Sequence, residues 1–273
     1  MLEKINETVA FIRQKGITGP EAGVILGTGL GGLTAHITGT IEIDYKDIPH
    51  FPVSTVEGHA GQLIYGDFGG KKIVAMKGRF HYYEGYQPEQ IAFPIRVMKH
   101  LGIKYLFLSN AAGGVNPEFH IGDIMIIRDH INLIPNPLIG RNDSRIGARF
   151  PDMSQPYDKK LIDMAVSIAA RNNITVRKGV YLGTTGPTFE TPAEYKFFHI
   201  IGADSVGMST VTEVIAARHM GLPVFGVSII TDLGVEGKIE YVTHEMVQRE
   251  AEKAEILMTT IMTELISELI SEL

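Results

Sequence analysis

The segment Gly23–Gly32, GVILGTGLGG, decides the fold class because it places an apolar run directly before a glycine-rich loop. Gly23–Leu26 predicts a short buried strand, and Gly27–Gly32 matches the G-x-G-x-x-G pattern of dinucleotide-binding loops. A dinucleotide site also needs a crossover helix before the next parallel strand, which takes about a dozen residues or more. Only residues 33–38 precede the next expected strand, which disfavours an NAD-dependent oxidoreductase. The loop can still bring its backbone N–H groups and the Thr28 hydroxyl close to an anion, the alternative being a plain tight turn.

Apolar periodicity predicts helices and strands that alternate along the whole chain. We expect helices at residues 3–15, 89–100, 159–171, 192–201, 210–220 and 243–273. We expect strands at residues 23–26, 41–45, 62–68, 72–77, 105–109, 124–127, 176–182, 204–208 and 223–230. Such alternation without a break in composition favours an α/β fold, with a central, mixed and largely parallel β-sheet flanked by helices. Residues 1–273 are expected to form a single domain.

Prolines and glycines mark three places in this pattern. Gly69 and Gly70 form the expected turn of a hairpin between residues 62 and 77. Pro94 is expected to interrupt and kink the helix at residues 89–100. The Pro-, Asn- and Gly-rich segment Pro135–Pro156 is long for a connection without a helix or strand, which predicts a role in function or in an interface.

Composition excludes several classes of protein. The chain has 273 residues and no cysteine, so disulfides, thiolate catalysis and cysteine-bound zinc are excluded. The net charge is −6 and there is no basic run, so we expect no nucleic-acid partner. The charged N-terminal segment lacks the apolar stretch of a signal peptide, and no window has the length and apolarity of a membrane span. We therefore expect a cytoplasmic enzyme without a membrane partner.

Polar side chains suited to an anion occur in three further motifs. Arg79 and His81 lie two residues apart in GRFHYYEG, so they would project to the same side of an extended segment. A guanidinium fork beside an imidazole suits a phosphate dianion. His59, in VEGHAG, is a further candidate, and Ser209, in VGMST, stands where a strand is expected to meet a helix N-terminus. The alternatives are a surface arginine, histidines satisfied elsewhere, and simple helix capping by Ser209 or Thr210.

The segment TTGPTFETPAE offers a surface for a flat heterocycle. Phe189 can stack on an aromatic ring, and Glu190 beside it can accept hydrogen bonds from ring N–H and amino groups. The alternative is a helix N-terminus that Glu190 merely helps to cap. Met208 is by itself more typical of a core position than of a ligand contact.

Eight motifs follow one another along nearly the whole chain: GTGLGGL, TVEGHAG, GRFHYYEG, SNAAGGVN, ARFPDMS, GPTFETPAE, GADSVGMSTVTEVIAARH and SIITD. Each motif alone is weak, but together they resemble the trimeric, low-molecular-weight class of purine nucleoside phosphorylases, in the nucleoside phosphorylase family. The resemblance implies a metal-free glycosyltransferase without a cofactor, acting in purine salvage. Its substrates would be a purine nucleoside, such as inosine or guanosine, and inorganic phosphate as co-substrate. The products would be the base and α-ribose 1-phosphate, or its 2-deoxy form.

The resemblance also implies a role for each matching residue. The phosphate would be held by Thr28, His59, Arg79, His81, Ser209 and the backbone of Ala111. The nucleoside would be bound by Tyr83, Phe189, Glu190, Gly207, Met208, Thr231, Asp232 and His244, with His244 on the 5′-hydroxyl. Catalysis would rest on Asp232, His81 and Glu190. In a homotrimer, Phe150 would reach into the site of the adjacent subunit and cover the sugar.

Asp232 departs from that class, because relatives specific for 6-oxopurines carry asparagine at this position. Asparagine can donate to N7 and to O6, whereas ionised aspartate only accepts and suits a 6-amino group. Protonated aspartate could donate to N7, which would require a pKa raised by a dry pocket. Two hypotheses follow: either inosine and guanosine stay preferred and adenosine is accepted better, or adenosine or methylthioadenosine is the main substrate. A nucleoside hydrolase and a non-catalytic nucleotide-binding module rank below both.

Overall fold

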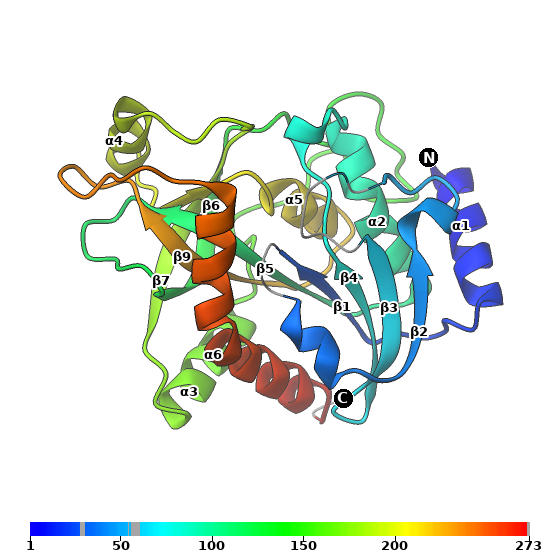
Figure 1. Ribbon diagram of the computed structural model, residues 1–273. Coiled ribbons are helices and arrows are strands. Elements are labelled where there is room, and N and C mark those ends of the chain that lie inside the picture. The colour runs from blue at the N-terminus through cyan, green and yellow to red at the C-terminus, as the bar shows by residue number, and fades with distance from the viewer. Residues whose placement is uncertain (28–30, 54, 56–60, 272–273) are drawn as a thin grey trace.

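The computed structural model describes residues 1–27, 31–53, 55 and 61–271, and it has a central mixed sheet flanked by helices (Figure 1). The helices are α1 (Leu2–Gln14), α2 (Pro88–Leu101), α3 (Lys159–Arg171), α4 (Pro192–Ile200), α5 (Val211–His219) and α6 (His244–Ser271). The strands are β1 (Ala22–Leu26), β2 (Thr38–Asp44), β3 (Gln62–Phe68), β4 (Lys71–Lys77), β5 (Tyr105–Gly114), β6 (Ile124–Asn132), β7 (Val176–Gly183), β8 (Ser205–Gly207) and β9 (Val224–Leu233). The predicted α/β class is confirmed, while the extent of the domain, residues 1–273, stays a prediction.

The strands form one sheet in the order β2-β3-β4-β1-β5-β8-β7-β6-β9, and β9 also pairs with β5. The strands β5, β8, β7, β6 and β9 therefore close into a ring. β1 is parallel to β4 and β5, and β5 is parallel to β9. The carboxyl ends of these four strands consequently meet at one edge of the sheet, where α/β proteins usually bind ligands.

The structure agrees with the exclusion of a dinucleotide-binding unit. A short 3₁₀ helix, η1 (Gly32–His36), follows the glycine loop, and β2 then pairs antiparallel with β3 at the sheet edge. The neighbours of β1 are β4 and β5, so β1 and β2 form no parallel crossover unit. The hairpin of β3 and β4 is present as predicted, and both turn residues, Gly69 (φ 59°) and Gly70 (φ 83°), have the left-handed backbone that a tight hairpin turn requires.

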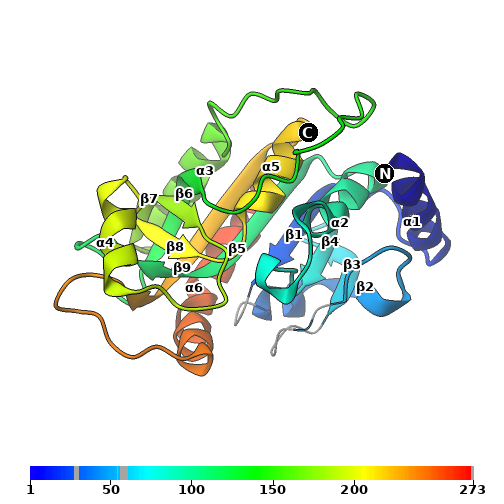
Figure 2. The same cartoon turned by 90° about the horizontal axis from the view of Figure 1, so that it is seen from above.

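Helices cover both faces of the sheet. α6 lies on one face, while α2 and α5 lie on the other, with α1 packed beside α2 (Figures 1 and 2). α2 continues through Pro94 as one helix, and α4 begins with a capping box in which Thr191 and Glu194 satisfy each other's backbone N–H groups. In the part of the chain that the structure describes, no helix has the length and apolarity needed to cross a bilayer.

Several strands are longer than their apolar runs predict, and β5 and β6 are extended the most. β5 continues from the expected end at Ser109 to Gly114, because Ala111 pairs with Ile229 and Gly113 pairs with Asp232 on β9. β6 continues to Asn132 because its second half pairs with β7. Backbone pairing with a partner strand extends both beyond the residues that hydrophobicity marks, and it carries the polar end of β5 to the site described below.

We predict that Phe107→Ala removes about 3–5 kcal/mol of stability, because Phe107 is fully buried in β5 and packs on Phe225 of β9, with ring centroids 6.3 Å apart. Urea unfolding at one fixed protein concentration measures the loss. The matched control is Phe197→Ala on α4, where the ring is 51% exposed, with an expected loss of less than about 1 kcal/mol. Equal losses for the two variants would contradict the assignment of the core to the β5–β9 pair.

Candidate active site

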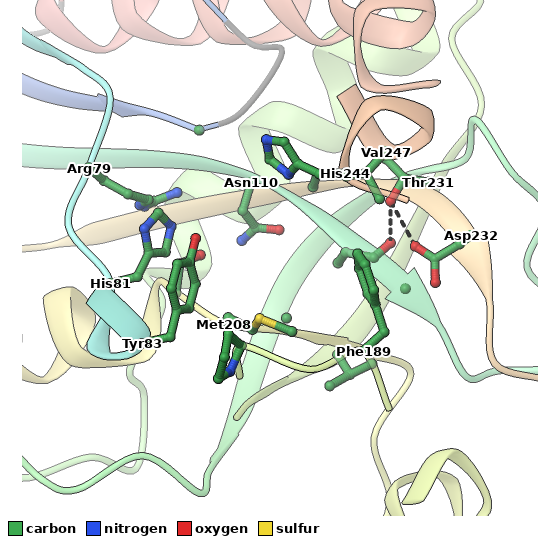
Figure 3. Close-up of a pocket in the computed structure, with 18 of the residues that line it drawn as sticks. Arg79, His81, Tyr83, Asn110, Phe189, Met208, Thr231, Asp232, His244 and Val247 are labelled. Carbon is green, nitrogen blue, oxygen red and sulfur yellow. Dashed lines mark hydrogen bonds between the residues drawn. The ribbon is translucent and has the colours of Figure 1, made fainter. Parts of the chain in front are cut away.

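A cavity of about 430 Å³ lies at the carboxyl ends of β1, β4, β5 and β9 (Figure 3). Residues beyond or at the ends of these strands line it: Gly27, Arg79, Asn110, Ala111, Gly113, Thr231 and Asp232. The turn between β8 and α5 supplies the opposite wall with Gly207, Met208 and Ser209. A side chain at Gly27 would place its Cβ 2.9 Å from the carbonyl oxygen of Ser109 and 3.3 Å from Nη1 of Arg79, so only glycine fits this approach.

Arg79 is buried, and its guanidinium forms a bidentate ion pair with Glu213 on α5. The distances are 2.9 Å from Nε to Oε1 and 3.0 Å from Nη2 to Oε2, while Nη1 donates to the carbonyl oxygen of Ser109 at 2.5 Å. The sequence pattern predicts a fork directed at an anion, but here the Nε edge of the fork faces Glu213. An anion in the cavity would therefore meet the Nη end of the guanidinium, whose positive charge the buried carboxylate already balances.

Glu213 is a site residue that the sequence motifs did not single out. It is 2% exposed and stands in the first turn of α5, a helix whose residues are buried on nearly all sides. A carboxylate inside a buried helix has to be paired, because an isolated buried charge is too costly. That combination, one acidic residue among the apolar residues of the first two turns of α5, is the sequence signal that marks Glu213.

His81 is held by Glu84 and lies against Tyr83. Oε1 of Glu84 accepts hydrogen bonds from the backbone N–H of His81 at 2.7 Å and from its Nδ1 at 2.9 Å, and the His81 and Tyr83 rings stack with centroids 4.7 Å apart. Burial lowers the pKa of His81, and the hydrogen bond to Glu84 opposes that shift. Burial also opposes ionisation of Glu84, but hydrogen bonds from His81 and Thr55 outweigh it and lower the pKa of Glu84 to about 2. The result is an ionised carboxylate that fixes the orientation of the imidazole.

Ser209 lies just before α5, next to a residue with strained backbone. Thr210 has φ 68°, which is unusual for a β-branched residue, and Asn110 donates to its hydroxyl at 2.8 Å. The hydroxyls of Ser209 and Thr210 are 3.1 Å apart, and the backbone N–H of Ser209 donates to the hydroxyl of Tyr181 at 3.3 Å. Thr210 is the N-cap residue of α5, but its side chain forms no capping hydrogen bond. The structure therefore does not support the alternative that these hydroxyls only cap the helix.

Two carboxyl groups and an aromatic ring form the other side of the cavity. Phe189 is 41% exposed and lies on the same side of the cavity as Asp232, away from Arg79 and His81 (Figure 3), and Glu190 also lines the cavity. Burial raises the pKa of Glu190 to about 7, and the nearby Asp232 adds to this shift. Burial also raises the pKa of Asp232, against a hydrogen bond of 3.0 Å from the hydroxyl of Thr231 and an interaction with Tyr195. Both groups are thus less acidic than usual.

Most of the residues that the sequence singled out line this one cavity: Arg79, His81, Tyr83, Ala111, Phe189, Glu190, Gly207, Met208, Ser209, Thr231, Asp232 and His244. Phe150 does not, since it is 88% exposed in the long segment after β6, with Arg149 over its ring. Thr28 and His59 lie outside the described residues. Among the described residues, no three His, Asp or Glu side chains gather as metal ligands would.

Asn110, Glu84 and Tyr195 are further residues of the site that the motifs did not single out. Asn110 is 2% exposed in β5 and lies within SNAAGG, a motif too weak to assign individual roles. Glu84 lies three residues after His81, a spacing at which a short helical turn brings two side chains together. Tyr195 lies on α4, outside the cavity lining, and its ring packs against Gly234 just after β9; nothing in its local sequence points to its effect on the pKa of Glu190 and Asp232.

Comparison with known proteins places this geometry in a family. The profile of the Phosphorylase superfamily matches residues 21–267. Purine nucleoside phosphorylase 1 of Bacillus subtilis is 51% identical over 256 residues, covering 93% of this chain and 94% of that relative.

Solved structures agree with the sequence match. The structure of Schistosoma mansoni purine nucleoside phosphorylase in complex with adenosine superposes with a TM-score of 0.93 at 41% identity, covering 98% of this chain and 97% of that one. Isoform 2 from the same organism, in complex with cytosine and ribose-1-phosphate, gives a TM-score of 0.93 at 42% identity, covering 98% and 96%. The chain belongs to the phosphorylase superfamily, among the purine nucleoside phosphorylases.

Proposed function

We propose that this chain catalyses the reversible phosphorolysis of purine nucleosides, transferring the ribosyl group from the purine to inorganic phosphate in purine salvage. The observation that carries the proposal is the composition of one cavity. Arg79, His81 and Ser209 line one side of it, whereas Phe189, Glu190 and Asp232 line the other. A tetrahedral anion and a flat base thus have adjacent places, with room for one sugar between them.

The phosphate side relies on donors that are already positioned. Ser209 offers a hydroxyl, the backbone of Ala111 lies at the same strand end, and Arg79 presents its Nη end. His81 binds Glu84 through Nδ1, so its Nε2 donates to phosphate when the ring is protonated and accepts from a protonated phosphate oxygen when the ring is neutral. Because Glu213 balances the charge of Arg79, hydrogen bonding and the other donors have to supply much of the affinity for the dianion. Thr28 and His59 complete the set that the resemblance implies.

The base side suits a purine. Phe189 stacks on the ring, Glu190 faces N1 and any 2-amino group, and Asp232 faces N7. A protonated Asp232 donates to N7 as the leaving base gains negative charge, and its raised pKa supports that state. Phosphate is itself the nucleophile, so no covalent enzyme intermediate, metal or cofactor is required by the scheme. Attack on C1′ with inversion yields the α-anomer, and the phosphate charge stabilises oxocarbenium character at C1′.

The sugar lies between the two sides, near Tyr83, Met208 and His244, all of which line the cavity. We place the 5′-hydroxyl at His244. The homotrimer is part of the proposal, with Phe150 covering the sugar of the adjacent subunit, and the 88% exposure of that ring within one chain supports it. The cytoplasmic location remains a prediction from the sequence.

Inosine and guanosine are the proposed main substrates, with adenosine accepted because of Asp232. Glu190 in its ionised form accepts from the protonated N1 of a 6-oxopurine, which supports this preference. The adenosine complex of the Schistosoma mansoni relative supports the second hypothesis, an adenosine-preferring enzyme.

Base release from inosine should depend on inorganic phosphate and yield α-ribose 1-phosphate, because the anion is the nucleophile. Ser209→Ala should lower kcat/KM for phosphate about tenfold or more, since it removes a hydrogen bond to a charged group. Initial rates at varied phosphate concentration measure this, with Ser167→Ala on the exposed face of α3 as the matched control. Turnover at full rate without phosphate, or recovery of the β-anomer, would refute the proposed reaction.

Asp232→Asn should raise the ratio of kcat/KM for inosine to that for adenosine about tenfold or more. The asparagine amide can donate to N7 and O6 of a 6-oxopurine, whereas the substitution removes the carboxylate that accepts from the amino group of a 6-aminopurine. Steady-state kinetics with both nucleosides at saturating phosphate give the ratio. Asp163→Asn, in the exposed ion pair with Lys159 on α3, is the matched control and should leave it unchanged. Negligible adenosine turnover together with an unchanged ratio in Asp232→Asn would show that Asp232 has no special role.

A further inference from the structure

A hydrogen-bond network joins the protein core to the segment Pro135–Pro156, for which the sequence predicts a role in function or in an interface. Nη1 of Arg96, on α2, donates to Nδ1 of His219, the last residue of α5, at 3.3 Å. Nε2 of His219 lies 3.2 Å from Oδ1 of Asn142, and Nδ2 of Asn142 donates to the carbonyl oxygen of Gly147 at 3.0 Å. Arg96 and His219 are 5% and 7% exposed, so the network begins inside the protein and ends within the segment.

Each hydrogen bond of this network has only one possible direction. A guanidinium only donates and a backbone carbonyl only accepts, which settles the two ends. Nδ1 of His219 must therefore accept, so in the neutral ring Nε2 carries the hydrogen and donates to Asn142. Burial and the charge of Arg96 both lower the pKa of His219, which agrees with a neutral ring. The imidazole is thus fixed in the one tautomer that can join α2 to the segment.

Close packing holds the segment against the end of α5 at the same point. A Cβ at Gly147 would lie 2.7 Å from Nε2 of His219, and closer still to the carbonyl oxygen of that residue, so only glycine permits this approach. Figure 2 shows the segment, in green between β6 and α3, passing beside α5. Hydrogen bonds and packing together therefore fix residues 142–147 relative to α5.

Phe150 comes shortly after Gly147, and its neighbour Arg149 supports it. Nη1 of Arg149 donates to the carbonyl oxygens of Leu138 and Gly140, at 3.2 and 2.8 Å, which closes the segment on itself. Cζ of the same guanidinium lies 5.7 Å from the centroid of the Phe150 ring, which is 88% exposed. Because the segment is closed on itself, the place where it meets α5 sets where Phe150 is presented.

We propose that Arg96, His219 and Asn142 act together as positioning residues for nucleoside binding, because they hold the segment so that Phe150 covers the sugar in the adjacent subunit. The inference rests on the proposed function, which assigns Phe150 to that sugar. An aromatic cover stabilises a bound sugar only while it lies against it, since a gap of about 0.5–1 Å loses roughly a quarter to a half of the van der Waals attraction. Arg96 provides the fixed end of the network, because α2 packs on α5.

The segment also contains a polar pair outside this network. Nη2 of Arg145 lies 2.6 Å from Oδ2 of Asp143, and 69% of the Arg145 side chain is exposed. The two residues are close in sequence, so their pair stabilises a local turn rather than the contact with α5. Its removal is a matched control for removal of the network.

Asn142→Ala tests the proposal, because it interrupts the network at a half-buried residue of the segment and leaves Arg96 and His219 in place. The KM for inosine should rise about five- to tenfold, while the KM for phosphate should change less than about twofold, because the phosphate donors lie on other elements. Phe150→Ala should give the same split. Initial rates with one substrate varied and the other saturating measure both constants, and Arg145→Ala should change neither.

The double variant distinguishes positioning of Phe150 from a general loosening of the segment. In the Phe150→Ala background, Asn142→Ala should change the KM for inosine less than about twofold, because the residue through which it acts is already absent. Additive effects, an unchanged KM in either single variant, an equal rise in Arg145→Ala, or a changed oligomeric state of Asn142→Ala by light scattering would overturn the positioning role. Absence of phosphate-dependent base release in the unchanged enzyme would instead overturn the proposed function itself.

Discussion

The buried ion pair between Arg79 and Glu213 is the interaction on which the geometry of the cavity depends. It joins the segment after β4 to the first turn of α5, and Nη1 of the same guanidinium holds the carbonyl oxygen of Ser109 on β5. Removal of one partner would leave an uncompensated buried charge, a loss of about 3–5 kcal/mol. The pair therefore fixes where Ser209, just before α5, lies relative to His81, just after Arg79, and these two residues define the place for an anion.

The two sides of the cavity differ in their electrostatics, and the difference suits the reaction. Near Arg79, charges are paired in advance: Glu213 balances the guanidinium and Glu84 orients His81, so the donors keep their positions. Near Asp232, burial disfavours ionisation and raises the pKa of both Asp232 and Glu190, which favours the protonated Asp232 that the proposed reaction uses. The raised pKa values reduce the negative charge on the two carboxyl groups, so they repel a phosphate dianion in the same cavity of about 430 Å³ less strongly.

The sequence predicted the fold class, the hairpin, nearly every helix, and the cluster of motif residues that now line one cavity. It could not predict the extension of β5 to Gly114, because pairing with β9 rather than hydrophobicity sets that end. Nor could the sequence predict which way the guanidinium of Arg79 faces, because its partner Glu213 is 134 residues away in the chain. The position of Tyr195 was not predicted for the same reason, because its contact with Gly234 depends on how α4 packs beside the end of β9. Local patterns mark which residues carry chemistry, whereas contacts between distant segments decide how those residues are oriented.

The most direct test of the account is a crystal structure of the protein with inorganic phosphate and hypoxanthine bound together. The account predicts phosphate bonded to His81, Ser209 and the Nη end of Arg79, and the purine against Phe189 with its edge toward Glu190 and Asp232. A single gap the size of a ribose would separate the two ligands. Phosphate bound outside the cavity, or a purine whose edge turns away from both carboxyl groups, would contradict it.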